Sequence, residues 1–203
     1  MEDERATGPV LVAVENPDHV QQLVRTAGDL ARLGSGVVRL VTVVTKPRDS
    51  PFSIFEDETI RREFAADSHA LLERATTPPD VTLEREILVA RSPARGLLSA
   101  VEEAEPTGLV VGWTEGRRRA DAVLGTTVDA LVERAPCDLY VERVGREADG
   151  VGSVLLPVAG GPNVRVAATA ATVIAVRNDA EVLVLSVATD EVTPDDASRY
   201  VEE

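Results

Sequence analysis

A glycine-containing stretch near the middle of the chain carries residue types that bind phosphate groups. The apolar run 109–111 ends at Gly112, a polar segment with three consecutive arginines (117–119) follows, and Gly125-Thr126-Thr127 precedes an amphipathic segment. This order predicts a strand, a loop and the N-terminus of a helix. Backbone N–H groups and the positive end of the helix dipole bind anions there, glycine lets the backbone approach a phosphate, and threonine can cap the helix or donate its hydroxyl. The alternative is an ordinary strand-to-helix turn with a threonine cap.

Alternating strands and helices must position this loop. Continuous apolar runs are typical of strands buried on both faces, and crossovers between parallel strands are right-handed. The sequence therefore predicts an α/β fold, with a mainly parallel sheet and helices on both faces. Ligands in such sheets bind beyond the carboxyl ends of the strands, where Glu15 and Gly112 would lie. We expect strands at 10–14, 37–45, 81–89, 109–111 and 139–141. We also expect four helices: one that Asn16 or Asp18 caps, one over about 57–75, one that begins at Ser92 and one that begins at Thr126.

The glycine stretch, with Ala135-Pro136-Cys137 after it, resembles the universal stress protein family. Members carry Gly-x2-Gly-x9-Gly-Ser/Thr before a helix that ends near Ala-Pro-Cys-Pro. The resemblance covers residues 8 to about 145 and implies a five-stranded, adenine-nucleotide alpha-hydrolase-like sheet in the order 3-2-1-4-5. It also implies that ATP or AMP, with or without magnesium, binds between the ends of the first and fourth strands. The middle glycine of the motif is Glu115 in this chain, with Gly116 one residue later, and a carboxylate at this position would repel phosphates.

The resemblance implies a set of site residues drawn from several segments. Glu15 would accept hydrogen bonds from the ribose hydroxyls, and Val43 would lie against the adenine. The arginine triplet would fold over the phosphates, or alternatively would be a solvated loop that offsets an acidic surface. Family members also pair through their fifth strand. The implied nucleotide site is Ala13, Val14, Glu15, Val43, Val111, Gly112, Gly116, Gly125, Thr126 and Thr127, with Arg117, Arg118 and Arg119 as further phosphate contacts, and the implied dimer strand is Leu139, Tyr140 and Val141.

Residues 152–189 repeat residues 8–45 without a gap. The ungapped register favours tandem domains over chance similarity of two β-α-β units. We expect an N-terminal extension (1–7), a first domain (8–145), a linker (146–151) and an incomplete second repeat (152–203). A β-α-β piece is too small to bury its own apolar faces, so it would dock on the first domain or pair with another chain. The chain could also be a fragment of a longer tandem protein.

The composition limits the classes of partner. The net charge is −14, and Lys46 is the only lysine. This acidic, lysine-poor balance resembles proteins of salt-loving archaea, with an acidic protein from a GC-rich genome as the alternative. It argues against nucleic-acid binding. The single cysteine, Cys137, fits a reducing cytosol and a structural thiol. The sequence shows no apolar run of membrane-spanning length and no signal peptide, so we expect a cytoplasmic protein.

Two functions stay open from the sequence. The first is a regulatory module that binds an adenine nucleotide and dimerises. The second is a nucleotide-independent module for oligomerisation or partner docking; either could be the cytosolic tail of an amino-acid transporter, because the loop resembles the tandem stress-protein domains of archaeal permeases. Motifs for pyrophosphate chemistry, a nucleophile elbow and a metal-ligand cluster are absent from the sequence, and His19 and His69 fall in different helices. We therefore expect no catalytic residues and no metal site, although slow ATP hydrolysis is not excluded.

Overall fold

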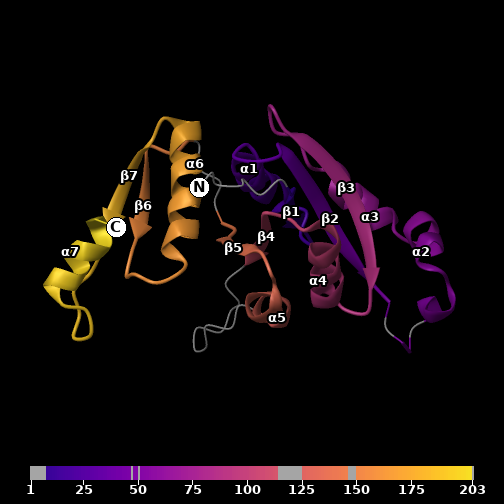
Figure 1. The fold of residues 1–203 in the computed structure, drawn as a ribbon. Coiled ribbons are helices and arrows are strands. Elements are labelled where there is room, and N and C mark those ends of the chain that lie inside the picture. Colours follow the sequence, from indigo (N-terminus) through magenta and orange to yellow (C-terminus); the bar gives the residue numbers. More distant parts are fainter. Residues whose placement is uncertain (1–7, 47, 50, 114–124, 146–149, 203) are drawn as a thin grey trace. The chain divides into compact units, whose positions relative to one another are not determined.

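The larger part of the chain is built on a five-stranded parallel sheet in the order β3-β2-β1-β4-β5. The strands are β1 (Val10–Ala13), β2 (Val37–Thr45), β3 (Thr82–Ala90), β4 (Gly108–Trp113) and β5 (Asp138–Arg143). Val10 is in register with Val38 on one side and with Gly108 on the other, so β1 and β4 are neighbours (Figure 1). The predicted fold class and strand order are confirmed.

This computed structural model describes residues 8–46, 48–49, 51–113, 125–145 and 150–202. The chain divides into two compact units, Met1–Arg146 and Glu147–Glu203. The expected extension 1–7 and most of the expected linker lie outside the described residues.

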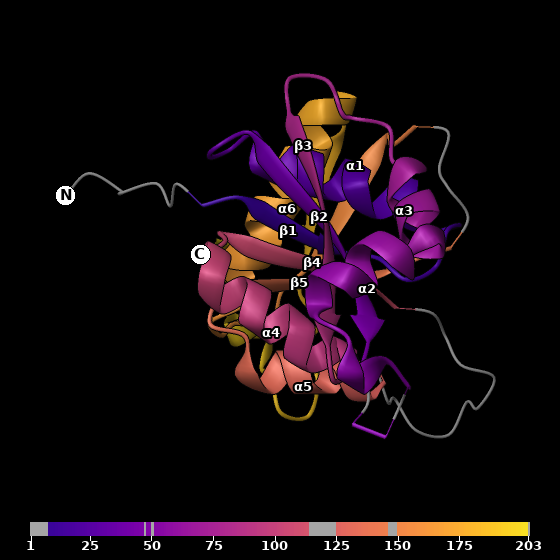
Figure 2. The ribbon, with the colours of Figure 1, turned by 90° about the vertical axis from the view of Figure 1, so that its right-hand side faces the viewer.

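Helices cover both faces of the first sheet. Leu11, Val41 and Leu109 form a buried cluster with side chains of α4 (Pro93–Ala104) and α5 (Thr126–Arg134). Alternation along β1 directs Val10 and Val12 to the opposite face, where α1 (Val20–Ala31) packs. Figure 2 shows α4 and α5 together on one side of the sheet, away from α1 and α3. The central strands of the sheet are therefore buried on both faces.

The helix expected over 57–75 is broken. A short 3₁₀ turn (Pro51–Ile54) leads to α2 (Asp57–Glu63), and α3 (Ala66–Glu73) follows after two non-helical residues. Ile60 and Leu72 are both buried, yet twelve residues apart on a straight helix they would differ by about a third of a turn. The break lets both reach the core, and it turns Phe64, expected inward, to 47% exposure beside the Phe55 ring.

The expected cap of α1 is also wrong. His19 occupies the N-cap position and makes no capping bond through its side chain. Asn16 instead stabilises the preceding turn, because its Oδ1 accepts the Asp18 N–H at 3.0 Å. The helix expected from Ser92 is present as α4, and the Ser92 Oγ caps it by accepting from the Arg95 N–H at 3.4 Å.

The second unit is the partial β-α-β copy that the repeat predicts. β6 (Ser153–Pro157) and β7 (Glu181–Leu185) are parallel neighbours, with α6 (Val164–Asn178) between them in sequence and α7 (Pro194–Glu202) after them. Leu156, Val158 and Ala171 form its small core, with Tyr200 packed against them. In the described part of the chain, no helix is long and apolar enough to cross a membrane.

Candidate functional site

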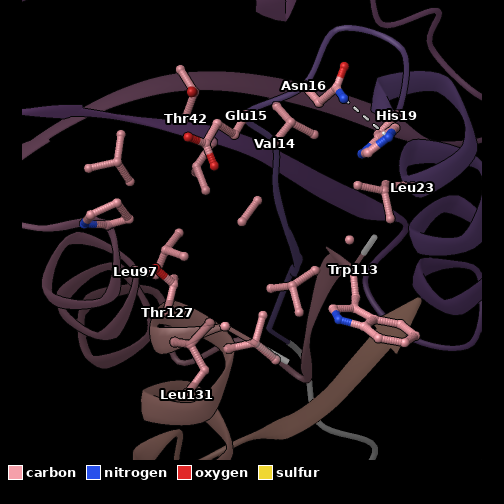
Figure 3. Close-up of a pocket in the computed structure, with 18 of the residues that line it drawn as sticks. Val14, Glu15, Asn16, His19, Leu23, Thr42, Leu97, Trp113, Thr127 and Leu131 are labelled. Carbon is pink, nitrogen blue, oxygen red and sulfur yellow. Dashed lines mark hydrogen bonds between the residues drawn. The ribbon is translucent and has the colours of Figure 1, made fainter. Parts of the chain in front are cut away.

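A cavity of about 650 Å³ lies at the carboxyl ends of β1, β2 and β4. It forms there because β1 leads into α1 on one face of the sheet, whereas β4 precedes α5 on the other face. Adjacent strands whose connections leave in opposite directions open a crevice between them. Figure 3 shows Glu15, Asn16 and His19 along one side of this cavity, with Thr127 and Leu131 on the opposite side.

The predicted site residues that the structure describes all line this cavity. They come from four segments that lie far apart in sequence, and the parallel sheet brings them together. Gly116, the arginines 117–119 and Glu115 lie outside the described residues. The predicted residues in the lining are Ala13, Val14, Glu15, Val43, Val111, Gly112, Gly125, Thr126 and Thr127.

The N-terminus of α5 faces the cavity, and no described residue is recorded as accepting from its first backbone N–H groups. Its N-cap is Gly125 rather than a threonine, and the helix has no side-chain cap. The φ of Gly125 is +100°, which favours glycine, and a Cβ there would meet open space. The first intrahelical bond runs from Asp129 N–H to the Gly125 carbonyl at 2.9 Å. The N–H groups of residues 126–128 therefore remain available to an anion.

Gly112 has a packing reason to be glycine. A Cβ at this position would lie 3.1 Å from Leu23 Cδ1 and 3.2 Å from Val144 Cγ2. Its neighbour in register on β5 is Glu142, whose Oε1 accepts from Gln22 Nε2 at 2.6 Å. Close approach of a phosphate is therefore not the only explanation for this glycine.

The cavity lining also includes residues that the sequence analysis did not assign to the site. Asn16, His19 and Thr42 line the cavity, and Trp113 joins them from the end of β4. Asn16 Nδ2 lies 3.2 Å from His19 Nε2. The signal that could have found Asn16 and Trp113 is position, because both lie at or just beyond the carboxyl end of a strand.

The edge of the sheet carries the predicted dimer strand. Leu139 and Val141 are half-buried against the core, and Tyr140 lies so close to Gly108 that a Cβ there would be 2.8 Å from its ring. Burial, with a smaller effect of Asp138, raises the pKa of Tyr140 from 10.0 to about 12. The same causes raise the pKa of the half-buried Cys137 thiol, which therefore favours its protonated form. Cys137 is a poor candidate for a nucleophile.

The lining residues suit binding better than bond-breaking chemistry. Glu15 and His19 are the charged or titratable side chains among the described lining residues. No group of three His, Cys, Asp or Glu side chains in the described part of the chain could hold a metal ion. The arrangement offers backbone donors on one side, a carboxylate and an imidazole on the other, and apolar walls between.

Several solved structures are similar to this chain. A universal stress protein from Lactobacillus plantarum is 23% identical, covers 70% of this chain and 100% of its own, and gives a TM-score of 0.48. A universal stress protein from Archaeoglobus fulgidus in complex with dAMP is 19% identical. It covers 67% of this chain and 98% of its own, and gives a TM-score of 0.44. A putative universal stress protein from Pseudomonas aeruginosa is 15% identical, covers 97% of this chain and 67% of its own, and gives a TM-score of 0.56.

The sequence itself assigns the family. The model of the universal stress protein family matches residues 7–143, which is more than half of the chain. The chain therefore belongs to the universal stress protein family. A comparison with curated protein sequences gives no match.

Proposed function

We propose that this protein is a regulatory module that binds an adenine nucleotide in the cavity between β1 and β4. The observation that carries the proposal is the N-terminus of α5, whose first N–H groups have no recorded partner among the described residues and face a cavity of about 650 Å³. Ligand pockets have volumes of about 300–1,000 Å³, and helix N-termini are frequent phosphate sites. The family motif supports the same site, since Gly112, Gly125 and Thr126 occupy its positions.

The lining suggests how the ligand lies. Val43 and the buried Leu97 flank the cavity on the β2 and α4 side, where an apolar base would fit. Glu15 is exposed and can accept from ribose hydroxyls. The phosphates would then lie at Gly125–Thr127. Binding, rather than turnover, would be the event that changes the state of the module.

The single tryptophan allows a direct test. Trp113 lines the cavity, so its fluorescence should change when ATP or AMP binds. We expect a dissociation constant in the micromolar range, measured at high and low salt because the net charge is −14. Mass spectrometry of ligand released from acid-denatured protein is the independent measurement. Neither released nucleotide nor a titration signal at either salt concentration would contradict the proposal.

The change Glu115→Gly sharpens this test. The family motif places position 115 beside the phosphates, so removing its carboxylate should remove a repulsion and raise the affinity for ATP by about threefold, while that for adenosine stays constant. Equal affinities of the variant and the parent for ATP would show that Glu115 does not face the phosphates.

A second function is favoured by the β5 edge. β5 pairs with β4 alone among the described strands, so its other edge could accept a strand of a second chain. Dimerisation through Leu139, Tyr140 and Val141 would need no nucleotide. Analytical ultracentrifugation of Val141→Lys, with and without AMP, separates the two functions. As a dimer or with a partner, the module would act in the cytoplasm or as the cytosolic tail of a transporter.

A further inference from the structure

A further cavity, of about 420 Å³, lies beyond the carboxyl ends of β2 and β3 and is called the β2–β3 cavity below. Its described lining carries three cationic side chains, Lys46, Arg48 and Arg91, against one carboxylate, Asp57. In the whole chain, by contrast, acidic residues outnumber basic ones by 35 to 21. The β2–β3 cavity is therefore positive on a strongly acidic protein.

The parallel pairing of two strands brings two of these cations together. Thr45 and Ala90 are in register at the ends of β2 and β3, and the Lys46 N–H donates to the Ala90 carbonyl oxygen at 2.7 Å. Lys46 and Arg91 therefore leave neighbouring strands at the same edge of the sheet. Arg48 joins them from the segment that follows β2.

Lys46 is held in place by the protein itself. Its Nζ donates to the Phe55 carbonyl oxygen at 2.5 Å and to Asp57 Oδ1 at 3.0 Å, and 22% of its side chain is exposed. An ammonium group has three donors, so one of them is left for a ligand. The Asp57 carboxylate offsets a single positive charge, and the charge of the two arginines is left over.

Arg48 and Arg91 supply this remaining charge. Both are exposed, and among the described residues no hydrogen bond or ion pair is recorded for either guanidinium. In the cavity beside α2 and α3 the arginines instead bind the protein: Arg61 donates to Glu58, and Arg85 donates to two backbone carbonyls. The guanidinium groups of the β2–β3 cavity are therefore the ones that a ligand can use.

We propose that the β2–β3 cavity binds a phosphate group, as inorganic phosphate or on a small phosphate monoester. Such a monoester carries a charge of about −1.5 to −2 at neutral pH and three acceptor oxygens, which suits a lining with two unbalanced positive charges and three cationic donor groups. Guanidinium groups bind phosphate through paired hydrogen bonds, and a lysine ammonium binds it as a point charge. The Ser53 hydroxyl in the lining is a further donor.

This site is separate from the proposed nucleotide site. The described linings of the two cavities have no residue in common, and the lining of the nucleotide cavity contains no lysine or arginine among its described residues. The inference therefore does not depend on the proposed function.

The test uses Lys46, which is the only lysine of the chain. Isotope-labelled lysine therefore gives one side-chain NMR signal, and that signal reports the β2–β3 cavity. It is followed during titration with inorganic phosphate and with glycerol 2-phosphate, with sodium chloride of equal ionic strength as the reference. We expect it to shift and to saturate with a dissociation constant of about 1 mM or less. Saturation by inorganic phosphate alone identifies the free anion as the ligand, and tighter binding of the ester identifies a monoester.

Three variants separate a bound phosphate from a general effect of charge. Arg91→Gln should weaken binding by about five- to tenfold, because charge-assisted hydrogen bonds are lost. Arg95→Gln is the matched control, since it removes the same charge from an exposed position on α4 outside the lining, and it should bind as the parent does. Asp57→Asn should tighten binding by about two- to threefold, because it removes the carboxylate and keeps an acceptor for Lys46.

Two results would contradict the inference directly. The first is a lysine signal that phosphate moves no more than sodium chloride does. The second is an equal loss of affinity in Arg95→Gln and Arg91→Gln, because the arginines would then act through net charge alone.

The fluorescence of Trp113, recorded on the same samples, separates this site from the nucleotide cavity that Trp113 lines. A change in fluorescence with an unmoved lysine signal would place the phosphate in the nucleotide cavity, which would overturn this inference and leave the proposed function standing. A saturating lysine signal in a protein that binds no nucleotide would have the opposite meaning.

Discussion

The segments β1–α1–β2 and β6–α6–β7 have the same order of elements and different surroundings. α6 and β7 begin 144 residues after α1 and β2, the offset at which the sequence repeats. Leu11 is 0% exposed, whereas Leu155 at the equivalent position is 59% exposed. β2 lies between β1 and β3, but β7 has a neighbour on one side alone among the described strands. An apolar pattern therefore specifies a strand, and the neighbours of that strand decide whether it is buried.

The two segments also differ at their carboxyl ends. Glu15, Asn16 and His19 open into the cavity, and the equivalent residues are Ala159, Gly160 and Asn163. Tyr200 from α7 covers the second position, since a Cβ on Gly160 would lie 2.7 Å from its ring. In the second segment, an aromatic side chain therefore fills the region beyond the first strand. In the first segment, the equivalent region is open to a ligand.

The matched changes Leu11→Ala and Leu155→Ala test the difference in burial and should give the largest effect. Removing a fully buried leucine costs about 2–5 kcal/mol, whereas the exposed leucine should cost less than about 1 kcal/mol. Chemical denaturation followed by circular dichroism measures both. Equal losses would mean that the exposed face of β6 is covered in solution, and the contrast between the segments would then disappear.

Exchanging residues between the segments tests the difference at the carboxyl ends. Glu15→Ala should lower the affinity for adenosine by about tenfold, because a ribose hydroxyl loses a charged acceptor. Adenosine is the right probe, since it has no phosphate for Glu15 to repel. The reverse exchange, Ala159→Glu, should leave the affinity unchanged. An undiminished affinity in Glu15→Ala would remove the ribose contact from the proposed site.

The smallest effect should be a loss of stability of the first unit at alkaline pH. It should be specific to this unit, because Tyr140 lies on β5, which has no counterpart among the described strands of the second unit. The pKa of Tyr140 is raised from 10.0 to about 12, so the unfolded chain loses its proton first as the pH rises. Stability should fall between these values, by no more than about 1 kcal/mol after solvent screening. Urea unfolding monitored by Trp113 measures the decline. Tyr140→Phe should lessen it, and an identical decline in this variant would assign the effect to other groups, Cys137 among them.

The strands of the first sheet could be predicted because their apolar runs are continuous. The bounds of β2 match the prediction, and the strand expected over 81–89 is present as β3, although its residues alternate between apolar and charged. The order of the strands came from the family resemblance, since the local pattern does not specify which strands pair. The equivalence of 152–189 with 8–45 likewise predicted β6, α6 and β7.

The rest depended on contacts between distant residues. The break after Glu63 arises because Ile60 and Leu72 must reach the same core, and a charged helical pattern does not encode that requirement. Gly125 rather than Thr126 caps α5, a choice made by backbone angles. His19 went unassigned because its place in the cavity follows from the turn that Asn16 builds, which periodicity does not reveal.

The pairing of β1 with β4 has a consequence for synthesis. Val10 pairs with Gly108, and the far wall of the cavity is built from residues up to Leu131. In a chain emerging from the ribosome, the apolar strand β1 therefore cannot pair with β4 until most of the first unit has been synthesised. Until then the cavity is incomplete, and a ligand of this site could select only chains whose first unit has been translated in full.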